Sequence, residues 1–187
     1  MQDSAESRGI YAALRRARAM LLRAETLLKG LEQRDMDEAV AGFYLIAVLG
    51  RSVTLTLQNI RTHDRERFNS WWPGMETAMR NDPLFRLMND LRNVYFKEGG
   101  MGVGFIGAEV AGWRHVLYRS RVFLSGPFAE GRGTIANHSL DELARVYLLG
   151  LRSIVDATAT RYLGRPLRDE SYRAFVTQPP TCLSSHR

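Results

Sequence analysis

The sequence predicts a mainly α protein: an antiparallel helical bundle with a small β-rich insertion or hairpin before its last long helix. Apolar residues recur at helical spacing over four long segments, and strand-like alternation with turn residues is confined to about residues 102–132. Helix start signals precede the later helices. The 187 residues suit one domain, which we expect over residues 1–165, followed by a loosely ordered tail over 166–187.

The first helix is expected from Ser4 to about Gln33, where apolar residues repeat every three or four positions. One broad face of it carries cations, while its acidic residues lie on or beside the apolar stripe. The cations are Arg8, Arg15, Arg16, Arg18, Arg23, Lys29 and Arg34. This pattern is typical of a solvated helix face or of a surface that binds a polyanion, and both interpretations stay open.

The second helix starts at the acidic segment Asp35–Glu38 and is expected to reach about Arg61. Its first half, Ala39–Gly50, is apolar all round, as in the central helix of a bundle, and is shorter than the roughly 20 residues of a membrane span. Arg51 follows directly. Because an unpaired buried cation is costly, we expect Arg51 to have a carboxylate partner or to lie at a polar interface.

A polar connection from His63 leads to three aromatic residues, which are expected to pin it to the bundle or, alternatively, to stack on bases. They are Phe68, Trp71 and Trp72. A short helix is expected over residues 75–80. The segment Asn81-Asp82-Pro83 then starts a long helix that ends near Gly99.

The run Gly99–Gly112 contains the letters of a dinucleotide-binding fingerprint but follows a helix instead of a strand, so we expect a flexible connection. One or two strands are expected within Val110–Leu124. The capping box Ser139–Glu142 starts the last long helix.

The amino-acid composition limits the kinds of functional site that the chain can form. The chain has 26 lysines and arginines against 20 acidic residues, and all of these cations except Lys29 and Lys97 are arginines, whose forked donors suit phosphate and carboxylate. Cys182 is the only cysteine, and no histidine pair, catalytic triad or P-loop pattern occurs. We therefore expect no metal and no cofactor. The first residues do not resemble a signal peptide, so a cytoplasmic location without membrane contact is expected.

One polar cluster stands out on the helix that begins at Asp82-Pro83. It consists of Asp90, Arg92, Asn93, Lys97 and Glu98. Asn93 and Lys97 are four residues apart and therefore neighbours on one helix face. Because Arg92 and Lys97 repel each other, the cluster is either a knot of ion pairs or a site for an anion.

The segment Leu91–Gly99, with Arg92, Asn93 and Lys97-Glu98, resembles the R-N-x-x-x-H signature of HEPN domains. The sequence before this motif is similar to that of a group of uncharacterised bacterial HEPN-like proteins that carry lysine before Glu-Gly. The similarity lies in the aromatic residues Phe68, Trp71 and Trp72, in Met79 and in Asp82-Pro83. The resemblance implies a helical bundle that dimerises. It also implies a link to metal-independent ribonucleases of toxin–antitoxin, CRISPR and phage-defence systems. Implied partners are RNA, a second copy of the chain, and a cognate antitoxin or defence partner.

The resemblance makes Arg92, Asn93 and Lys97 the candidate catalytic residues, with one departure. The family's histidine is Lys97 here, and an ordinary lysine has a pKa near ~10.4 against ~6.5 for histidine, so it is a poor general base. His63 is a candidate to replace the missing histidine. We therefore expect a degenerate or non-catalytic HEPN-like module that binds RNA or a partner protein. An active endoribonuclease and a scaffold without nucleic-acid binding are the alternatives.

Overall fold

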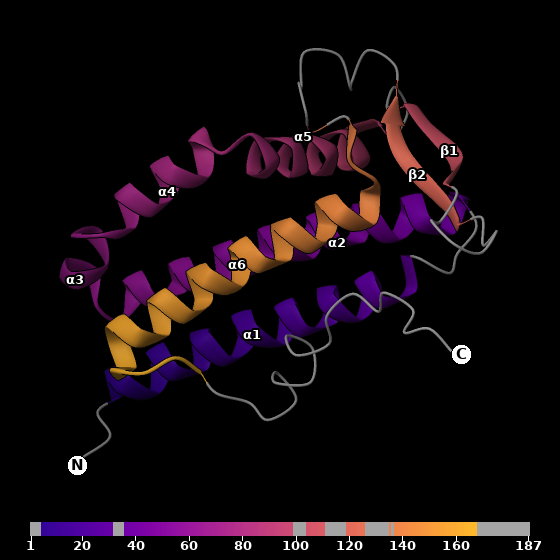
Figure 1. The fold of residues 1–187 in the computed structure, drawn as a ribbon. Helices are drawn as coiled ribbons and strands as arrows, with labels where there is room; N and C mark the ends of the chain where they lie inside the picture. Colours follow the sequence, from indigo (N-terminus) through magenta and orange to yellow (C-terminus); the bar gives the residue numbers. More distant parts are fainter. Residues whose placement is uncertain are drawn as a thin grey trace, which may run out of the picture.

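The structure is a computed structural model that describes residues 5–31, 36–98, 104–110, 119–125, 135 and 137–167. Helices dominate it, as the sequence predicts (Figure 1). The elements are α1 (Ala5–Leu31), α2 (Met36–Gln58), the 3-10 helix η1 (Asn59–Thr62), α3 (Arg65–Asn69), α4 (Trp72–Asn81), α5 (Pro83–Glu98), β1 (Gly104–Val110), β2 (Arg119–Ser125) and α6 (Leu140–Leu163). Of the expected C-terminal tail, only residues 166 and 167 are described.

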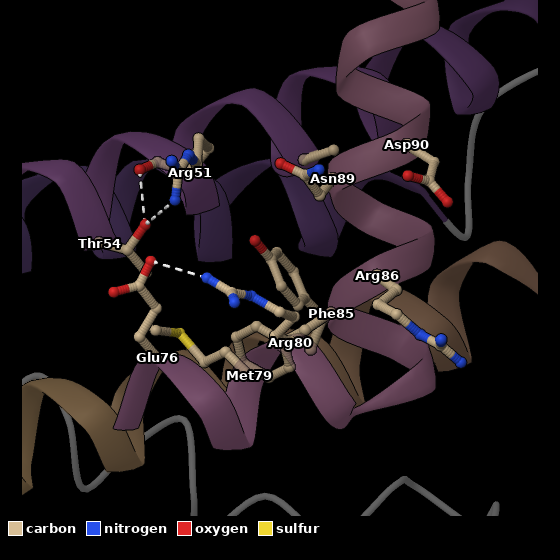
Figure 2. Close-up of a pocket in the computed structure, with 11 residues that line it drawn as sticks. Arg51, Thr54, Glu76, Met79, Arg80, Phe85, Arg86, Asn89 and Asp90 are labelled. Carbon is tan, nitrogen blue, oxygen red and sulfur yellow. Dashed lines mark hydrogen bonds and ion pairs between the residues drawn. The ribbon is translucent and has the colours of Figure 1, made fainter. Parts of the chain in front are cut away.

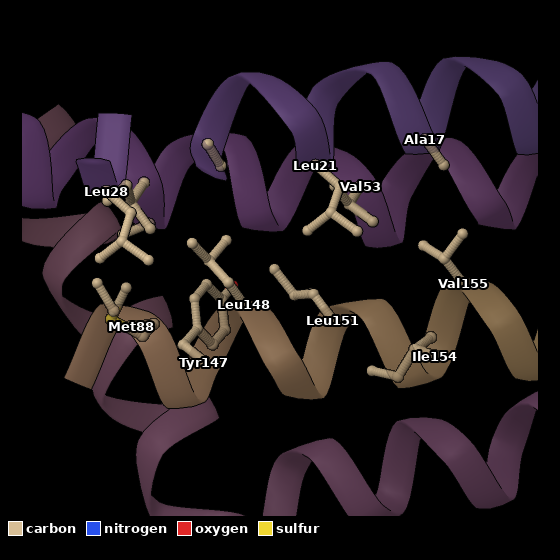
Figure 3. Packing of buried hydrophobic residues seen from close by; sticks show 14 of the residues in the cluster. Ala17, Leu21, Leu28, Val53, Met88, Tyr147, Leu148, Leu151, Ile154 and Val155 are labelled. Atoms are coloured by element: carbon tan, nitrogen blue, oxygen red, sulfur yellow. The ribbon is translucent and has the colours of Figure 1, made fainter. Parts of the chain in front are cut away.

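Three long helices, α1, α2 and α6, form the centre of the molecule and contact one another along their lengths. The chain runs one way in α1 and the opposite way in α2 and α6, while α4 and α5 return along the other side of α6 (Figure 1). Leu21 and Leu28 of α1 face Leu148 and Leu151 of α6 in the core (Figure 3). The apolar stripes seen in the sequence are therefore the faces that the helices bury against one another.

α2 is the most enclosed helix because it contacts α1, α5 and α6. With η1 it forms a stretch, Met36–Thr62, that is long and apolar enough to cross a membrane by length and composition. The run Ala39–Gly50 alone is too short to span a membrane, because it leaves out the apolar residues that follow Arg51. In the fold, 56% of the apolar window is buried, which is also what the core helix of a soluble protein shows.

The connection after α2 is more ordered than the sequence indicated, because it contains the short helix α3. The Asp64 carboxylate accepts a hydrogen bond from the backbone of Arg67 at 3.1 Å and caps this helix. Phe68 and Trp72 are buried, and their ring centroids lie 5.0 Å apart in a stacked arrangement. The expectation that the aromatic residues pin the connection to the bundle is confirmed.

α5 begins where the sequence predicts. The Asp82 carboxylate accepts hydrogen bonds from the backbone N–H groups of Leu84 and Phe85, at 2.8 and 3.0 Å, and so satisfies two donors of the first helical turn. The apolar stripe of α5, with Leu87 and Leu91, is buried in the common core. The opposite face of α5 carries its polar residues.

The hairpin is present, but its first strand lies earlier than expected. β1 pairs antiparallel with β2, from Gly104 opposite Ser125 to Val110 opposite Arg119. The prediction of a flexible connection is therefore wrong for residues 104–110, which form a strand inside the glycine-rich run. The expected capping box of α6 is confirmed, since the Ser139 N–H donates to the Glu142 carboxylate at 3.0 Å.

Candidate functional site

The motif residues Arg92 and Asn93 lie on the C-terminal half of α5 and are half-buried. Arg92 Nη1 donates a hydrogen bond to Asn93 Oδ1 at 2.9 Å. The Arg92 guanidinium also lies over the ring of Phe96, 5.3 Å from its centroid. These two contacts hold the guanidinium against the helix surface, which leaves its remaining donors available to an anion.

Lys97 is exposed and forms no hydrogen bond or ion pair with any side chain that the structure describes. It therefore makes no ion pair with Asp90, and the side chain of Glu98 lies outside what the structure describes. Beside Lys97, the Phe96 ring is 61% exposed. Both interpretations of the cluster, a knot of ion pairs and an anion site, therefore stay predictions, since only the pairing of Lys97 with Asp90 is contradicted.

His63 does not join the motif. It is an exposed residue between η1 and α3, and its ring lies so close to Gly9 of α1 that a Cβ at Gly9 would be 2.3 Å from it. α3 lies at the end of the bundle away from the hairpin, whereas α5 extends toward the hairpin (Figure 1). Within a single chain, the structure therefore does not bring His63 to the motif residues of α5.

The cationic face of α1 is present and faces solvent. Five of the six predicted binding residues are exposed: Arg8, Arg15, Arg16, Arg23 and Lys29. Within the described part of the chain, Arg8, Arg16 and Arg23 have no carboxylate partner, and Arg15 lies 6.0 Å from the ring centroid of Tyr11. Arg18 differs, because it is half-buried and donates a hydrogen bond to the backbone carbonyl of Leu167.

An arrangement that the sequence did not reveal is a pocket of about 290 Å³ between α2, α4, α5 and α6 (Figure 2). Arg51 and Thr54 of α2 face Glu76 and Arg80 of α4 across it, and Arg86 extends from α5 on the outer side (Figure 2). Its lining residues are Ala47, Arg51, Thr54, Glu76, Met79, Arg80, Phe85, Arg86, Asn89, Asp90 and Tyr147. Three arginines against two carboxylates make this an electropositive hollow.

Two glycines give the pocket its aromatic wall. A Cβ at Gly50 would lie 2.4 Å from the hydroxyl oxygen of Tyr147, and a Cβ at Gly150 would lie 2.9 Å from the ring of Phe85. The two rings meet edge to face, with centroids 4.9 Å apart. Burial raises the pKa of the Tyr147 hydroxyl, and the nearby Arg51 guanidinium opposes this effect only in part. Tyr147 therefore stays a neutral donor at the pocket wall.

The expectation for Arg51 is met by a polar interface and not by a carboxylate. Arg51 Nη1 donates to Thr54 Oγ1 at 3.5 Å, and no carboxylate in the described ranges pairs with it. Sequence reasoning missed Arg80 and Arg86 as pocket residues. The signal available was Arg51 itself, a cation directly after an apolar half-helix. Within the described residues, no cluster of histidine, cysteine and acidic side chains is placed to hold a metal ion.

Comparison with protein-family models, with curated proteins and with solved structures finds no match for the chain. The resemblance to HEPN domains therefore stays a prediction from the sequence motif on α5. The described residues form two cationic surfaces, the α1 face and the pocket between α2, α4, α5 and α6.

Proposed function

We propose that the protein is a non-catalytic, HEPN-like module that binds RNA through the α1 face. The observation that carries this proposal is the set of four exposed arginines on α1, Arg8, Arg15, Arg16 and Arg23, none of which has a carboxylate partner in the described part of the chain. Cations that are not neutralised within the fold are available to phosphates.

The dimensions of this face suit a polymer. Arg8 and Arg23 are separated along α1 by about 22 Å, from a rise of about 1.5 Å per residue. A surface of this length can contact several successive phosphates of one strand. Arginine provides a planar fork of donors to each phosphate, which a lysine does not.

Binding without cleavage is favoured by the residue at the last motif position. An exposed lysine ammonium such as that of Lys97 can neutralise a phosphate, but it accepts a proton poorly and so replaces histidine badly as a general base. A homodimer in a bacterial defence or toxin–antitoxin setting is the context that the family resemblance implies.

Fluorescence anisotropy with a labelled single-stranded RNA, over a salt series from about 50 to 400 mM, tests the proposal. Replacement of Arg8, Arg15, Arg16 and Arg23 by glutamine should flatten the log–log salt slope by about three units, at about 0.7 per phosphate contact on a single strand. A control variant with the same net charge carries glutamine at Arg61, Arg65, Arg145 and Arg165, which are exposed elsewhere.

The proposal requires the control variant to bind like the wild type. Equal slopes for both variants would show that the α1 face is not the RNA surface. No RNA binding by the wild type at low salt would leave the scaffold alternative, and cleavage of the labelled RNA by the wild type would favour the endoribonuclease.

A further inference from the structure

The pocket between α2, α4, α5 and α6 plays no part in the proposed RNA binding, and its size indicates a small ligand. Its volume of about 290 Å³ lies near the lower end of the range for small-molecule sites, about 300–1,000 Å³. It combines charged donors with an aromatic wall, the mixture that positions small organic ligands.

Arg51 provides the main charge. The residue is half-buried, and the one hydrogen bond of its guanidinium within the described residues is the 3.5 Å contact to Thr54 Oγ1. A guanidinium has five N–H donors, and withdrawing it partly from water without a carboxylate costs free energy. A bound anion would supply the missing counter-charge.

Arg80 is a second cation that can turn toward a ligand. It pairs with Glu76 at 3.3 Å, one helical turn away on α4, and the two side chains are 73% and 49% exposed. Exposed pairs of this kind are weak, so exchange of Glu76 for a ligand oxyanion costs little. Since the one carboxylate facing Arg51 and Arg80 is Glu76, the facing charges sum to plus one (Figure 2).

The other side of the pocket is apolar. The Tyr147 and Phe85 rings form its wall, with Met79 and Ala47 beside them. The Tyr147 hydroxyl forms no hydrogen bond with another described residue, although it lies next to Arg51. One pocket thus contains both hydrogen-bond donors for a ligand oxyanion and an apolar surface for a ligand ring.

We propose that this pocket binds a small organic anion: a phosphate monoester or a carboxylate joined to an apolar body about the size of one aromatic ring. Arg51, with the hydroxyl of Tyr147, holds the oxyanion, and Arg80 adds a second charge. The Thr54 hydroxyl donates to the Arg51 backbone carbonyl at 2.9 Å and accepts from the Arg51 guanidinium, so it positions Arg51. The apolar body packs against Phe85 and Met79. Arg86, Asn89 and Asp90 form the polar rim.

Calorimetric titration of the full chain with four probes tests this proposal. Phenyl phosphate or benzoate should bind at least about tenfold more tightly than inorganic phosphate or benzyl alcohol, because each of the last two lacks one half of the recognised group. The tighter of the two aromatic anions identifies the oxyanion. Absence of binding by both at about 10 mM, or binding of the tighter aromatic anion no stronger than that of inorganic phosphate or of benzyl alcohol, would overturn the proposal.

Variants locate the site. Arg51→Gln should weaken binding of the aromatic anion by about tenfold or more, since charged hydrogen bonds are lost. Tyr147→Phe, which keeps the ring, should weaken it a fewfold. Arg61→Gln removes an exposed arginine outside the pocket and should change nothing. Equal affinities for Arg51→Gln and Arg61→Gln would overturn the assignment.

Thermal unfolding without ligand separates binding from a structural role. Arg51→Gln should leave the melting temperature unchanged or raise it, because it removes an uncompensated charge from a half-buried position. A lowered melting temperature together with unaltered affinity would mean that Arg51 only supports the fold. If Arg51→Gln does not fold, Arg51→Lys should still bind more weakly, because it keeps the charge and loses the fork.

Discussion

Arg152 of α6 forms an ion pair with Glu25 of α1 inside the bundle, where each side chain is only 7% exposed. The two residues are 127 positions apart in the chain, so the pair joins the first and last long helices. Burial raises the pKa of Glu25, and the attraction of Arg152 offsets this only in part. Burying the two charges therefore costs desolvation free energy. The same contact fixes how α1 lies on α6.

Breaking this pair from one side should destabilise the protein. Arg152→Met leaves a buried carboxylate without its main counter-charge, and we expect the free energy of unfolding to fall by about 3–5 kcal/mol at neutral pH. The double variant Glu25→Leu with Arg152→Met should recover most of this loss, because both desolvated charges are then gone. Urea unfolding followed by circular dichroism measures both, and a double variant as unstable as the single one would contradict the argument.

The raised pKa of Glu25 predicts an unusual pH trend. The ordinary pKa of a glutamate is 4.5. At a pH between this value and the raised pKa, the folded chain keeps a proton on Glu25 that the unfolded chain has released. The contribution of Glu25 to the free energy of unfolding therefore falls as the pH rises from about 4.5 to the pKa that Glu25 has in the folded chain. Above that pKa the contribution is constant.

The measurement is the unfolding free energy of the wild type minus that of Glu25→Gln, which cancels the other carboxylates. This difference should decrease as the pH rises toward neutrality. An increase would show that Arg152 lowers the pKa of Glu25 instead.

Two glycines offer a matched pair of substitutions. Gly50→Ala would place a Cβ 2.4 Å from the Tyr147 ring, and we expect a loss of about 1–3 kcal/mol from overpacking. Gly74→Ala meets no atom within 4 Å and lies in α4, so it should stabilise by about 0.4–1 kcal/mol. Thermal unfolding of the two variants checks the signs; stabilisation by Gly50→Ala would show that Tyr147 can move away.

Local signals allowed the helices to be predicted well. The capping hydrogen bonds of Asp82 and Ser139 reach only two or three residues along the chain, and both residues cap helices where the sequence placed them. The hairpin was predicted, but the position of β1 was missed because two of its seven residues are glycines, which weaken a strand signal. Its conformation depends on pairing with β2, a contact between residues up to 21 positions apart, from Gly104 to Ser125.

In the candidate sites, too, features that depend on local sequence could be predicted, and features that depend on distant contacts could not. The α1 face could be predicted because it depends on helical spacing alone, whereas Arg18 deviates because it contacts Leu167, far along the chain. The pocket could not be predicted, since Arg51 and Arg80 meet only after α4 has turned back toward α2. The partner of Glu25 was hidden for the same reason, although the position of Glu25 beside the apolar stripe was visible.

Lys97→Ala should separate binding from stability. Because Lys97 is exposed and has no partner among the described residues, we expect the unfolding free energy to change by less than about 0.5 kcal/mol. If α5 contributes a phosphate contact, the salt slope of RNA binding should fall by about one unit. An unchanged slope would confine RNA binding to α1, and a large loss of stability would contradict the contacts described for Lys97.

Lys97→His tests whether α5 retains the geometry of a nuclease. Arg92 is already held by Asn93 at 2.9 Å, and residue 97 lies one helical turn beyond Asn93. A histidine there supplies a group whose ordinary pKa, ~6.5, suits proton transfer at neutral pH. We expect slow cleavage of labelled RNA in the presence of a metal chelator, abolished by adding Arg92→Ala. A folded Lys97→His variant that cleaves no RNA would remove the support for a degenerate nuclease centre, and the proposed RNA binding would then depend on the arginines of α1.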